Sequence, residues 1–259
     1  MKRETIHEER DPLSSITVVL NETRYPENIG AAARACKNFG ITRIRLVRPE
    51  LLRMENVLKM ATHEARDLIE NMVVYDRLAN ALQDQTFVIG TSARTGRQRR
   101  PSHTPKEMAA LLPTLLANNR IALLFGSEKF GLNNEHLAFC NALVTIPTTN
   151  FSSLNLAQSV VVILYEIFEA LAGGVISRAE RPRLATVKER QGMFQHLEKL
   201  FGLMGLMEKQ PLDYWMRNAH RLLDRKDLTA RDVKTIRGFC RNAERAIRLG
   251  PAEHCNREE

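Results

Sequence analysis

The sequence predicts an α/β protein with a mostly parallel sheet, followed by a small region built only from helices. Two observations predict this class. From Ser15 to Ala172, short apolar runs alternate with segments of helical periodicity, whereas beyond residue 186 only the helical period remains. Runs that are apolar at every position are typical of parallel strands covered by helices on both faces.

Six short apolar runs are predicted as strands because polar or turn-forming residues bound them. In chain order they are Ile16–Leu20, Ile44–Val47, Val73–Tyr75, Phe87–Gly90, Ile121–Phe125 and Leu143–Ile146. Between them, helices are expected over Gly30–Phe39, Ala61–Ile69, Asp76–Leu82 and Pro105–Ala117. A longer apolar helix over Leu154–Ala172 closes this region, because Gly173 and Gly174 follow it and glycine commonly ends helices.

The remaining boundaries follow from changes in composition. We expect a solvated tail over residues 1–14, an α/β domain over 15–172, a Gly-rich and basic linker over 173–186, a helical region over 187–249 and a polar tail over 250–259. Thr186 and Thr229 each precede an acidic residue by three positions, which is the spacing of a capping box. Pro211 suits the first turn of a helix over Leu212–Leu223, so three helices are predicted after the linker.

Composition excludes several classes of protein. No apolar stretch approaches the roughly 20 residues of a membrane-spanning helix, and the polar first residues do not resemble a signal peptide, so we expect a cytoplasmic protein. Four scattered cysteines without a CxxC pair, and histidines without ligand spacing, predict neither disulfides nor a metal site. The formal net charge of +8 indicates a polyanionic partner, either nucleic acid or an anionic membrane surface.

Basic residues gather in two places. Between Arg94 and Lys106 there are five cations and no acid, and Arg94, Arg97, Arg99 and Arg100 are candidate contacts to a phosphate backbone. On the last predicted helix, the residues expected to face a core are Val233, Ile236, Cys240, Ala243 and Ile247. Another face carries Lys234, Arg237, Arg241, Arg245 and Arg248, and it is either a solvated surface or an RNA contact.

Four segments place small or polar residues directly after a predicted strand, over residues 21–34, 89–94, 124–132 and 146–157. Ligands of open α/β sheets bind at the carboxyl ends of strands, so these segments are expected to converge. Neither the GK[ST] ending of a P-loop nor a GxGxxG fingerprint occurs, which argues against nucleotide hydrolysis and against a nucleotide-dependent oxidoreductase. Ser152 or Ser153 is expected as the N-cap of the following helix, where free N–H groups could also hold an anionic ligand.

Three motifs in these segments resemble those of the SPOUT RNA methyltransferases. Asn28 and Arg34 have the N-x5-R spacing of the first motif, FGSEKFGL at 125–132 resembles the second, and IPTTNFSSLNLAQSV at 146–160 resembles the third. The resemblance covers residues 15–172. Residues 219–242 are also similar to the helical C-terminal extension of the TrmJ-type tRNA (cytidine/uridine-2′-O-)-methyltransferases.

The resemblance implies a sheet that ends in a trefoil knot, and a homodimer in which Arg34 of one subunit faces the cofactor of the other. S-adenosylmethionine would lie in the knot, held by Thr91, Ser92, Ala93, Gly126, Ile146, Ser152, Ser153 and Leu154. The catalytic candidates are Arg34, Asn28, Glu128, Ser153 and Asn155. The methyl donor carries its own electrophile, so no metal is expected.

Two roles for Arg34 remain open. Its guanidinium could stabilise the forming alkoxide of a ribose hydroxyl and bind the adjacent phosphate. Alternatively it could act as the general base, although a guanidinium that stays protonated in water is a poor base there. Sequence does not decide between the two.

The function implied by the resemblance is S-adenosylmethionine-dependent 2′-O-methylation of a ribose in tRNA, at a pyrimidine of the anticodon loop. Two alternatives remain, a TrmH-like enzyme acting on ribosomal RNA or another tRNA site, and a non-catalytic RNA-binding homologue. The helical extension favours the first. The presence of Asn28, Arg34, Glu128 and Asn155 argues against a degenerate copy.

Overall fold

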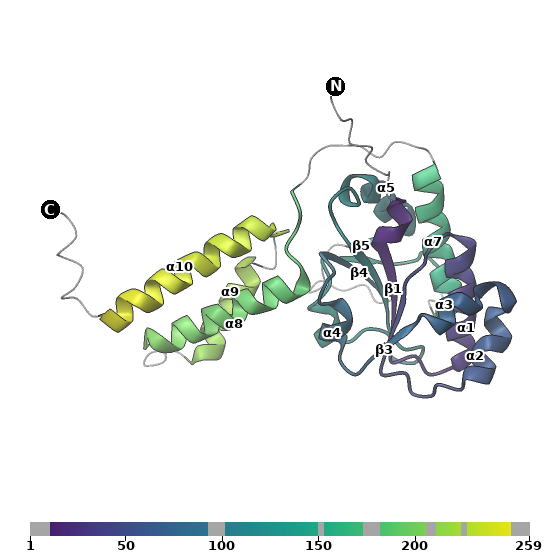
Figure 1. The fold of residues 1–259 in the computed structure, drawn as a ribbon, viewed down its shortest axis with the longest axis horizontal. Helices are drawn as coiled ribbons and strands as arrows, with labels where there is room; N and C mark the ends of the chain where they lie inside the picture. The colour runs from purple at the N-terminus through teal and green to yellow at the C-terminus, as the bar shows by residue number, and fades with distance from the viewer. Residues whose placement is uncertain are drawn as a thin grey trace, which may run out of the picture. The chain divides into compact units, whose positions relative to one another are not determined.

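The computed structural model describes residues 11–92, 102–149, 153–172, 182–205, 211–223 and 227–249. The chain forms two compact units, Met1–Arg181 and Pro182–Glu259. The first contains a β-sheet with helices packed on it, and the described part of the second contains three helices (Figure 1). Within the described ranges, no helix is long and apolar enough to cross a membrane.

Seven strands form the sheet in the part of the first unit that the structure describes. They are β1 (Ile16–Asn21), β2 (Ile44–Val47), β3 (Val73–Tyr75), β4 (Phe87–Thr91), β5 (Ser102–His103), β6 (Ile121–Phe125) and β7 (Ala142–Val144). Their order across the sheet is β3-β2-β1-β6-β4-β7-β5. Every neighbouring pair runs parallel, which confirms the predicted α/β class with a mostly parallel sheet.

Burial explains why the strands are apolar at every position. All residues of the central strands β1 and β6 are buried, because helices cover both faces of the sheet. At the edge strand β3 this cover is incomplete, and Val73 is 49% exposed. Register is set by pairs such as Leu20 with Phe125 and Gly90 with Leu124, so β1, β6 and β4 end at the same edge of the sheet.

Seven α-helices and two short 3-10 helices accompany these strands in the described part of the first unit. The α-helices are α1 (Pro26–Asn38), α2 (Met54–Ala61), α3 (Arg66–Glu70), α4 (Leu78–Leu82), α5 (Pro105–Leu115), α6 (Asn134–Leu137) and α7 (Leu156–Ala172); the 3-10 helices are η1 (Pro12–Ser15) and η2 (His63–Ala65). Helix α7 packs against both α1 and α5. Figure 1 shows α4 on the opposite side of the sheet from α1 and α7.

Several predicted elements are corrected by the structure. The prediction of a single helix over Ala61–Ile69 is wrong. Thr62 has a φ of 61°, which breaks the helical geometry between α2 and α3. The last strand spans Ala142–Val144 instead of Leu143–Ile146. The short elements β5 and α6 were not predicted, since two and four residues are too few to show a hydrophobic period.

Gly30 allows α1 and α2 to approach each other closely. A Cβ atom at this position would lie 2.1 Å from the carbonyl oxygen of Val57 and 2.9 Å from the Cβ of Met60. Both contacts are far shorter than atoms tolerate. The absence of a side chain at Gly30 is therefore required for the packing of α1 on α2.

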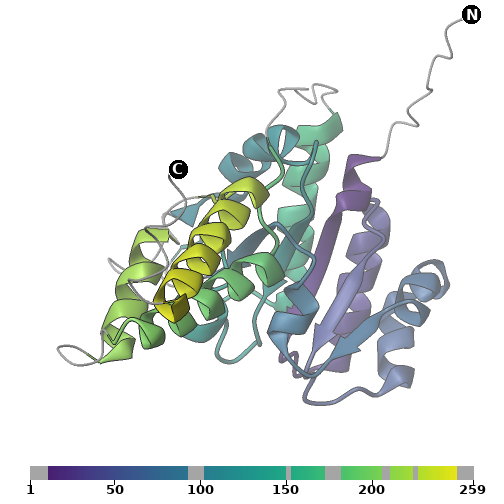
Figure 2. The ribbon, with the colours of Figure 1, turned by 60° about the vertical axis from the view of Figure 1, so that its left-hand side comes forward.

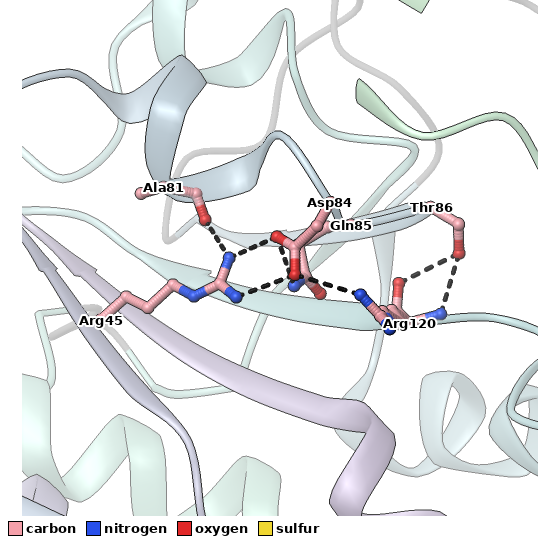
Figure 3. Close-up of polar contacts among 6 residues, drawn as sticks. All are labelled: Arg45, Ala81, Asp84, Gln85, Thr86 and Arg120. Carbon is pink, nitrogen blue, oxygen red and sulfur yellow. Dashed lines mark hydrogen bonds and ion pairs between the residues drawn. The ribbon is translucent and has the colours of Figure 1, made fainter. Parts of the chain in front are cut away.

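A charged cluster joins three segments of the first unit (Figure 3). Arg45 of β2 donates two hydrogen bonds to the Asp84 carboxylate, at 2.5 and 2.9 Å, and another to the carbonyl of Ala81 at 2.6 Å. Arg120, directly before β6, lies 3.5 Å from the same carboxylate. Burial alone would raise the pKa of Asp84, but the hydrogen bonds and the charge of Arg45 outweigh it and hold this pKa at about 2.

The second unit contains α8 (Val187–Leu203), α9 (Leu212–Leu223) and α10 (Ala230–Leu249), at the three positions predicted for helices. Both expected capping boxes are present, because Thr186 and Glu189, and likewise Thr229 and Asp232, exchange the required hydrogen bonds. The core consists of Ala185, Met193, Phe194, Leu228 and Val233. Both α9 and α10 pack against α8.

Helices α8 and α10 lie side by side and run in the same direction (Figure 2). Just before the two helices begin, Leu184 and Thr229 form a β-bridge. Farther along, the guanidinium of Arg237 lies against Gly192, where a Cβ would be 3.6 Å from its Nη1. Lys199 then contacts Glu244 at 3.2 Å. In all three pairs the two residues are separated by the same number of positions in the sequence, as parallel helices in register require.

Candidate active site

A pocket of about 280 Å³ lies where the segments after β4, β6 and β7 converge. It is formed by three of the four segments that were expected to meet at the carboxyl edge of the sheet. Of the predicted cofactor-binding residues, those that line it are Thr91, Ser92, Gly126, Ile146, Ser153 and Leu154. Ala93 and Ser152 lie outside the described residues.

Hydrogen bonds hold the rim of the pocket to the sheet. Thr91 donates from its hydroxyl to the carbonyl of Leu124 at 3.3 Å, which ties the end of β4 to β6. The N–H of Ser92 donates to the carbonyl of Val144 at 3.0 Å, which ties it to β7. The side chains at the strand ends are therefore placed by backbone that is itself fixed.

The loop after β6 closes tightly on itself beside the pocket. Ser127 and Gly131 form a β-bridge, and a Cβ at Gly126 would lie 2.2 Å from the carbonyl carbon of Gly131. Gly131 has a φ of +64°, a conformation that glycine adopts at little cost. Both glycines of the second motif are thus required by the turn, and the turn presents Glu128, Lys129 and Phe130 to the pocket.

A chain of hydrogen bonds connects the three motifs. Asn28 of α1 donates from Nδ2 to Oε1 of Glu128 at 2.7 Å, and Asn155 donates from Nδ2 to Oδ1 of Asn28 at 2.9 Å. Residues separated by 100 and 127 positions are thereby joined directly. Three of the predicted catalytic residues, Asn28, Glu128 and Asn155, form one network.

Glu128 acts within this network as an acceptor for several donors. Besides Asn28, it accepts the backbone N–H of Arg24 at 2.9 Å and that of Tyr25 at 3.4 Å. Both carboxylate oxygens are therefore engaged in holding the segment between β1 and α1 against the loop after β6. This geometry fits a residue that positions the site better than one that accepts a proton from substrate.

Asn155 is the N-cap of α7. Its side-chain oxygen accepts the N–H of Ala157 at 2.9 Å and that of Gln158 at 3.3 Å. The prediction of a cap at Ser152 or Ser153, and of a helix that begins at Leu154, is therefore wrong. Ser153 instead lines the pocket, because the helix begins two residues later than its apolar pattern suggests.

Arg34 does not line the pocket of its own chain. It is an exposed residue of α1 and follows Ala31 by three positions, on the same side of the helix. Ala31 lines a second, more open hollow between α1 and α7, together with Asn28, Met60, Asn155 and Val161. Asn28 and Asn155 thus line this second hollow, and Arg34 lies on the exposed surface of α1 about one turn beyond Ala31.

The predicted RNA contacts have three outcomes. Arg94, Arg97, Arg99 and Arg100 lie outside the described residues. Lys234 and Arg241 are exposed on α10. Arg237 was expected on the same cationic face, but its guanidinium packs against α8 at Gly192 and its Nε is buried. Ile247 was expected in the core, but it is 42% exposed; the buried residues of α10 are Val233 and Cys240, nearer its start.

Sequence reasoning also missed several residues that line the pocket. They are Phe125, Ser127, Lys129, Phe130, Gly131, Leu132, Val144, Leu156 and Ser159. Most belong to the second motif, where only Gly126 and Glu128 were singled out. Ser159 lies about one turn after Leu156, so helical spacing would have indicated it once the start of α7 was known.

The sequence profile of the SpoU rRNA Methylase family matches residues 15–165, which is more than half of the chain. The chain belongs to the SpoU methylase family. It is therefore an RNA 2′-O-methyltransferase, and SpoU methyltransferases use S-adenosylmethionine as the methyl donor. The resemblance to the SPOUT methyltransferases is confirmed.

Relatives align with nearly the whole SpoU chain. The tRNA (cytidine/uridine/adenosine-2′-O-)-methyltransferase TrmJ of Pseudomonas aeruginosa (strain UCBPP-PA14) is 35% identical over 248 residues, covering 91% of this chain and 96% of that protein. The tRNA (cytidine/uridine-2′-O-)-methyltransferase TrmJ of Escherichia coli O1:K1 / APEC is 33% identical over 247 residues, covering 93% and 100%. The crystal structure of TrmJ from Z. mobilis ZM4 superimposes with a TM-score of 0.74 at 28% identity, covering 88% and 98%.

The pocket has the chemical character that S-adenosylmethionine requires. Leu132, Ile146 and Leu154 provide apolar surface of the kind that packs on an adenine ring. Thr91 and Ser92 add polar groups at the end of β4, and Glu128 places a carboxylate near the cationic cofactor. The residues present in the pocket therefore fit the methyl donor used by the family.

Proposed function

We propose that this SpoU methyltransferase transfers a methyl group to the 2′-oxygen of a ribose in tRNA, at a pyrimidine of the anticodon loop. The observation that carries the proposal is the network from Glu128 through Asn28 to Asn155, which joins all three motifs at the edge of the pocket. The relatives that align with nearly the whole chain are named as tRNA methyltransferases for cytidine and uridine. Since tRNA is cytoplasmic, so is the proposed site of action.

The residues around the pocket have distinct proposed roles. Thr91, Ser92, Gly126, Ile146, Ser153 and Leu154 would hold S-adenosylmethionine, which supplies an electrophilic methyl group. As the ribose oxygen forms its bond to the methyl carbon, the bond from that carbon to sulfur would break and leave a neutral thioether, and the hydroxyl proton would pass to water. The guanidinium of Arg34 would stabilise the charge that develops on the ribose oxygen. Asn28, Glu128 and Asn155 keep the loops that surround the reacting atoms at a fixed spacing.

A homodimer would bring Arg34 to the pocket. In its own chain it is exposed on α1, about one turn after Ala31, which lines the open hollow between α1 and α7. Next to that hollow, α7 exposes Val161, Tyr165 and Phe168, which lie three to four positions apart and are 40–49% exposed. An apolar stripe of this kind favours contact with a second copy. We therefore propose that Arg34 completes the partner's site.

We also propose that the end of the sheet forms a trefoil knot. Strand β7, which is late in the chain, pairs with β4 instead of with β6, the strand before it in sequence. Helix α7 then returns between α1 and α5. A chain that crosses its earlier course in this order is compatible with the knot of the SPOUT class.

Two basic surfaces would hold the RNA. One is the segment with Arg94, Arg97, Arg99 and Arg100, which follows β4 in the sequence. The other is the exposed face of α10 with Lys234 and Arg241. Cations on both surfaces would contact phosphates without regard to sequence, so binding should weaken as salt increases.

The test is to incubate the purified protein with radiolabelled S-adenosylmethionine and unmodified total tRNA, followed by nucleoside analysis and mapping. The expected product is a 2′-O-methylated pyrimidine nucleoside in the anticodon loop. Ribosomal RNA serves as the competing substrate. Labelling of ribosomal RNA without labelling of tRNA would contradict the proposed substrate and favour the TrmH-like alternative.

A further inference from the structure

The outward side of α10 carries an exposed aromatic ring. Phe239 lies near the middle of the helix and is 69% exposed, the largest fraction of any large hydrophobic side chain in the described residues. A single exposed apolar side chain is ordinary on a protein surface. What surrounds the ring therefore decides whether it has a function.

Polar and basic residues continue the line of Phe239 along the helix. Thr235 lies one turn before it and Asn242 one turn after it, and both are exposed. Arg231 lies about two turns toward the start of α10, and Arg245 lies six residues toward its end on the neighbouring side of the helix; both are exposed. With a rise of about 1.5 Å per residue, their positions along the helix axis are about 12 Å before and about 9 Å after that of Phe239. The ring is thus flanked by positive charge on both sides.

The charge of this surface is not neutralised by the acids of α10. Asp232 accepts hydrogen bonds from the backbone and hydroxyl of Thr229, at 2.9 and 2.7 Å, and so caps the helix. Glu244 faces α8, where it contacts Lys199 and His196 at 3.2 Å each. Among the residues that the structure describes, neither Arg231 nor Arg245 forms an ion pair with an acid. A cationic surface with an exposed ring therefore remains.

We propose that Phe239 is a stacking platform for an unpaired base of the RNA substrate, with Arg231 and Arg245 on the phosphates to either side. Aromatic rings stack on bases of any sequence, and cations beside them follow the backbone. Thr235 and Asn242 are placed to hydrogen-bond the edges of the stacked base. The inference rests on the proposed function, because it takes RNA as the partner of this chain.

The partner must be single-stranded at the point of contact. Bases inside a double helix are already stacked on their neighbours and offer no free face to a phenyl ring. An anionic membrane would engage the arginines but offers no flat aromatic group on which the ring could stack. The combination of ring and flanking cations therefore favours an RNA loop or a single-stranded end.

The experiment measures binding of full-length protein to unmodified tRNA, to a single-stranded oligoribonucleotide and to the same oligonucleotide in a duplex, each over a range of salt concentrations. Phe239→Ala should weaken binding to tRNA and to the single strand by about 5- to 100-fold, as expected for loss of one base stack. Its salt dependence should be unchanged, and its binding to the duplex should equal that of the wild type. Phe239→Trp should restore the affinity.

Two controls separate stacking from other effects. Leu222→Ala removes an apolar side chain of α9 that is 68% exposed, and it should leave binding unchanged. Arg245→Ala should weaken binding to all three ligands and reduce the slope of log affinity against log salt by about 1. Circular dichroism confirms that each variant is folded before its affinity is compared.

Two outcomes would overturn the inference. One is equal affinity of wild type and Phe239→Ala for the single strand. The other is a loss of affinity that accompanies a change of molar mass in light scattering, which would assign Phe239 to an interface between copies of the chain. Methylation of tRNA by the wild type is measured separately, so that failure of the stacking site is distinguished from failure of the proposed function.

Discussion

Glu128, Asn28 and Asn155 show that residues from three distant motifs meet through hydrogen bonds. Each side chain has at least one partner from another motif or from a loop backbone, at distances between 2.7 and 3.4 Å. Amide and carboxylate groups suit this purpose because each offers several donor or acceptor positions. At the scale of single residues, the motifs of the SpoU chain are therefore explained largely by the need to hold loops in place.

Arg34 is the residue whose role is tested most directly. Arg34→Ala should abolish methylation, because the proposed site would lose the guanidinium that stabilises the developing charge on the ribose oxygen. Binding of S-adenosylmethionine should be nearly unchanged, since Arg34 does not line the pocket of its own chain. Tritium transfer to tRNA and calorimetric titration with the cofactor measure the two effects.

Lys37→Ala provides the matched control for Arg34. Lys37 is an exposed cation of the same helix, but its partner is Asp67 at 2.8 Å, away from the pocket. Its removal should leave methylation at the level of the wild type. Turnover by Arg34→Ala at the wild-type level would exclude Arg34 from the mechanism.

At the scale of elements, the packing of α1 on α2 depends on Gly30. Gly30→Ala should destabilise the protein by about 1–3 kcal/mol, because the new methyl group would overlap the Val57 carbonyl unless one helix moves. The free energy of unfolding is measured in urea. Since Asn28 precedes Gly30 on the same helix, a shift of α1 should also lower methylation.

Gly238→Ala is the control for this effect. Gly238 lies within α10, where the nearest atom to a new Cβ would be 3.8 Å away. Alanine should stabilise that helix by about 0.5–1 kcal/mol, since glycine loses more backbone freedom on folding. Equal destabilisation by both substitutions would show that close approach is not the reason for Gly30.

At the scale of the whole molecule, the cluster around Asp84 contributes stability that depends on pH. Its folded pKa of about 2 lies below the value of about 3.9 for an unfolded aspartate, so folding favours the charged form. The contribution is therefore present above about pH 4 and is lost as the pH falls through the folded pKa.

Asp84→Asn should accordingly reduce the free energy of unfolding at pH 7 by about 1–2 kcal/mol, allowing for the partial exposure of this carboxylate. The difference from wild type should shrink to about half at pH 3, because the carboxylate is then largely protonated in the unfolded chain and still mostly ionised in the folded protein. Urea unfolding at several pH values measures it. A difference that is constant between pH 7 and pH 3 would contradict the assignment.

Residues 187–259 can be tested as a unit, because they lie within the second compact unit, which has its own core. Their deletion should leave S-adenosylmethionine binding intact, since the lining of the pocket comes from the first unit. Affinity for tRNA should fall, and its salt dependence should flatten as the cations of α10 are lost. An unchanged salt slope would identify the cationic face of α10 as a solvated surface.

Much of this architecture is local in the sequence and was predictable for that reason. The strands β1, β2, β3 and β6 were predicted to within a residue because their apolar runs are continuous, and α9 was located by Pro211 and its period. Helix starts were less certain. The apolar pattern of α7 begins at Leu154, but the side chain of Asn155 caps the helix and delays its first turn to Leu156.

Only the tertiary structure decided which residues far apart in the chain contact each other. Sequence identified Asn28, Glu128 and Asn155 as candidates, but their mutual hydrogen bonds depend on the order of strands across the sheet, which no local pattern records. The same limit applies to Arg237, whose spacing places it among exposed cations while packing turns it toward Gly192. Periodicity reports which residues share a face of a helix, and only the neighbouring element determines which face is buried.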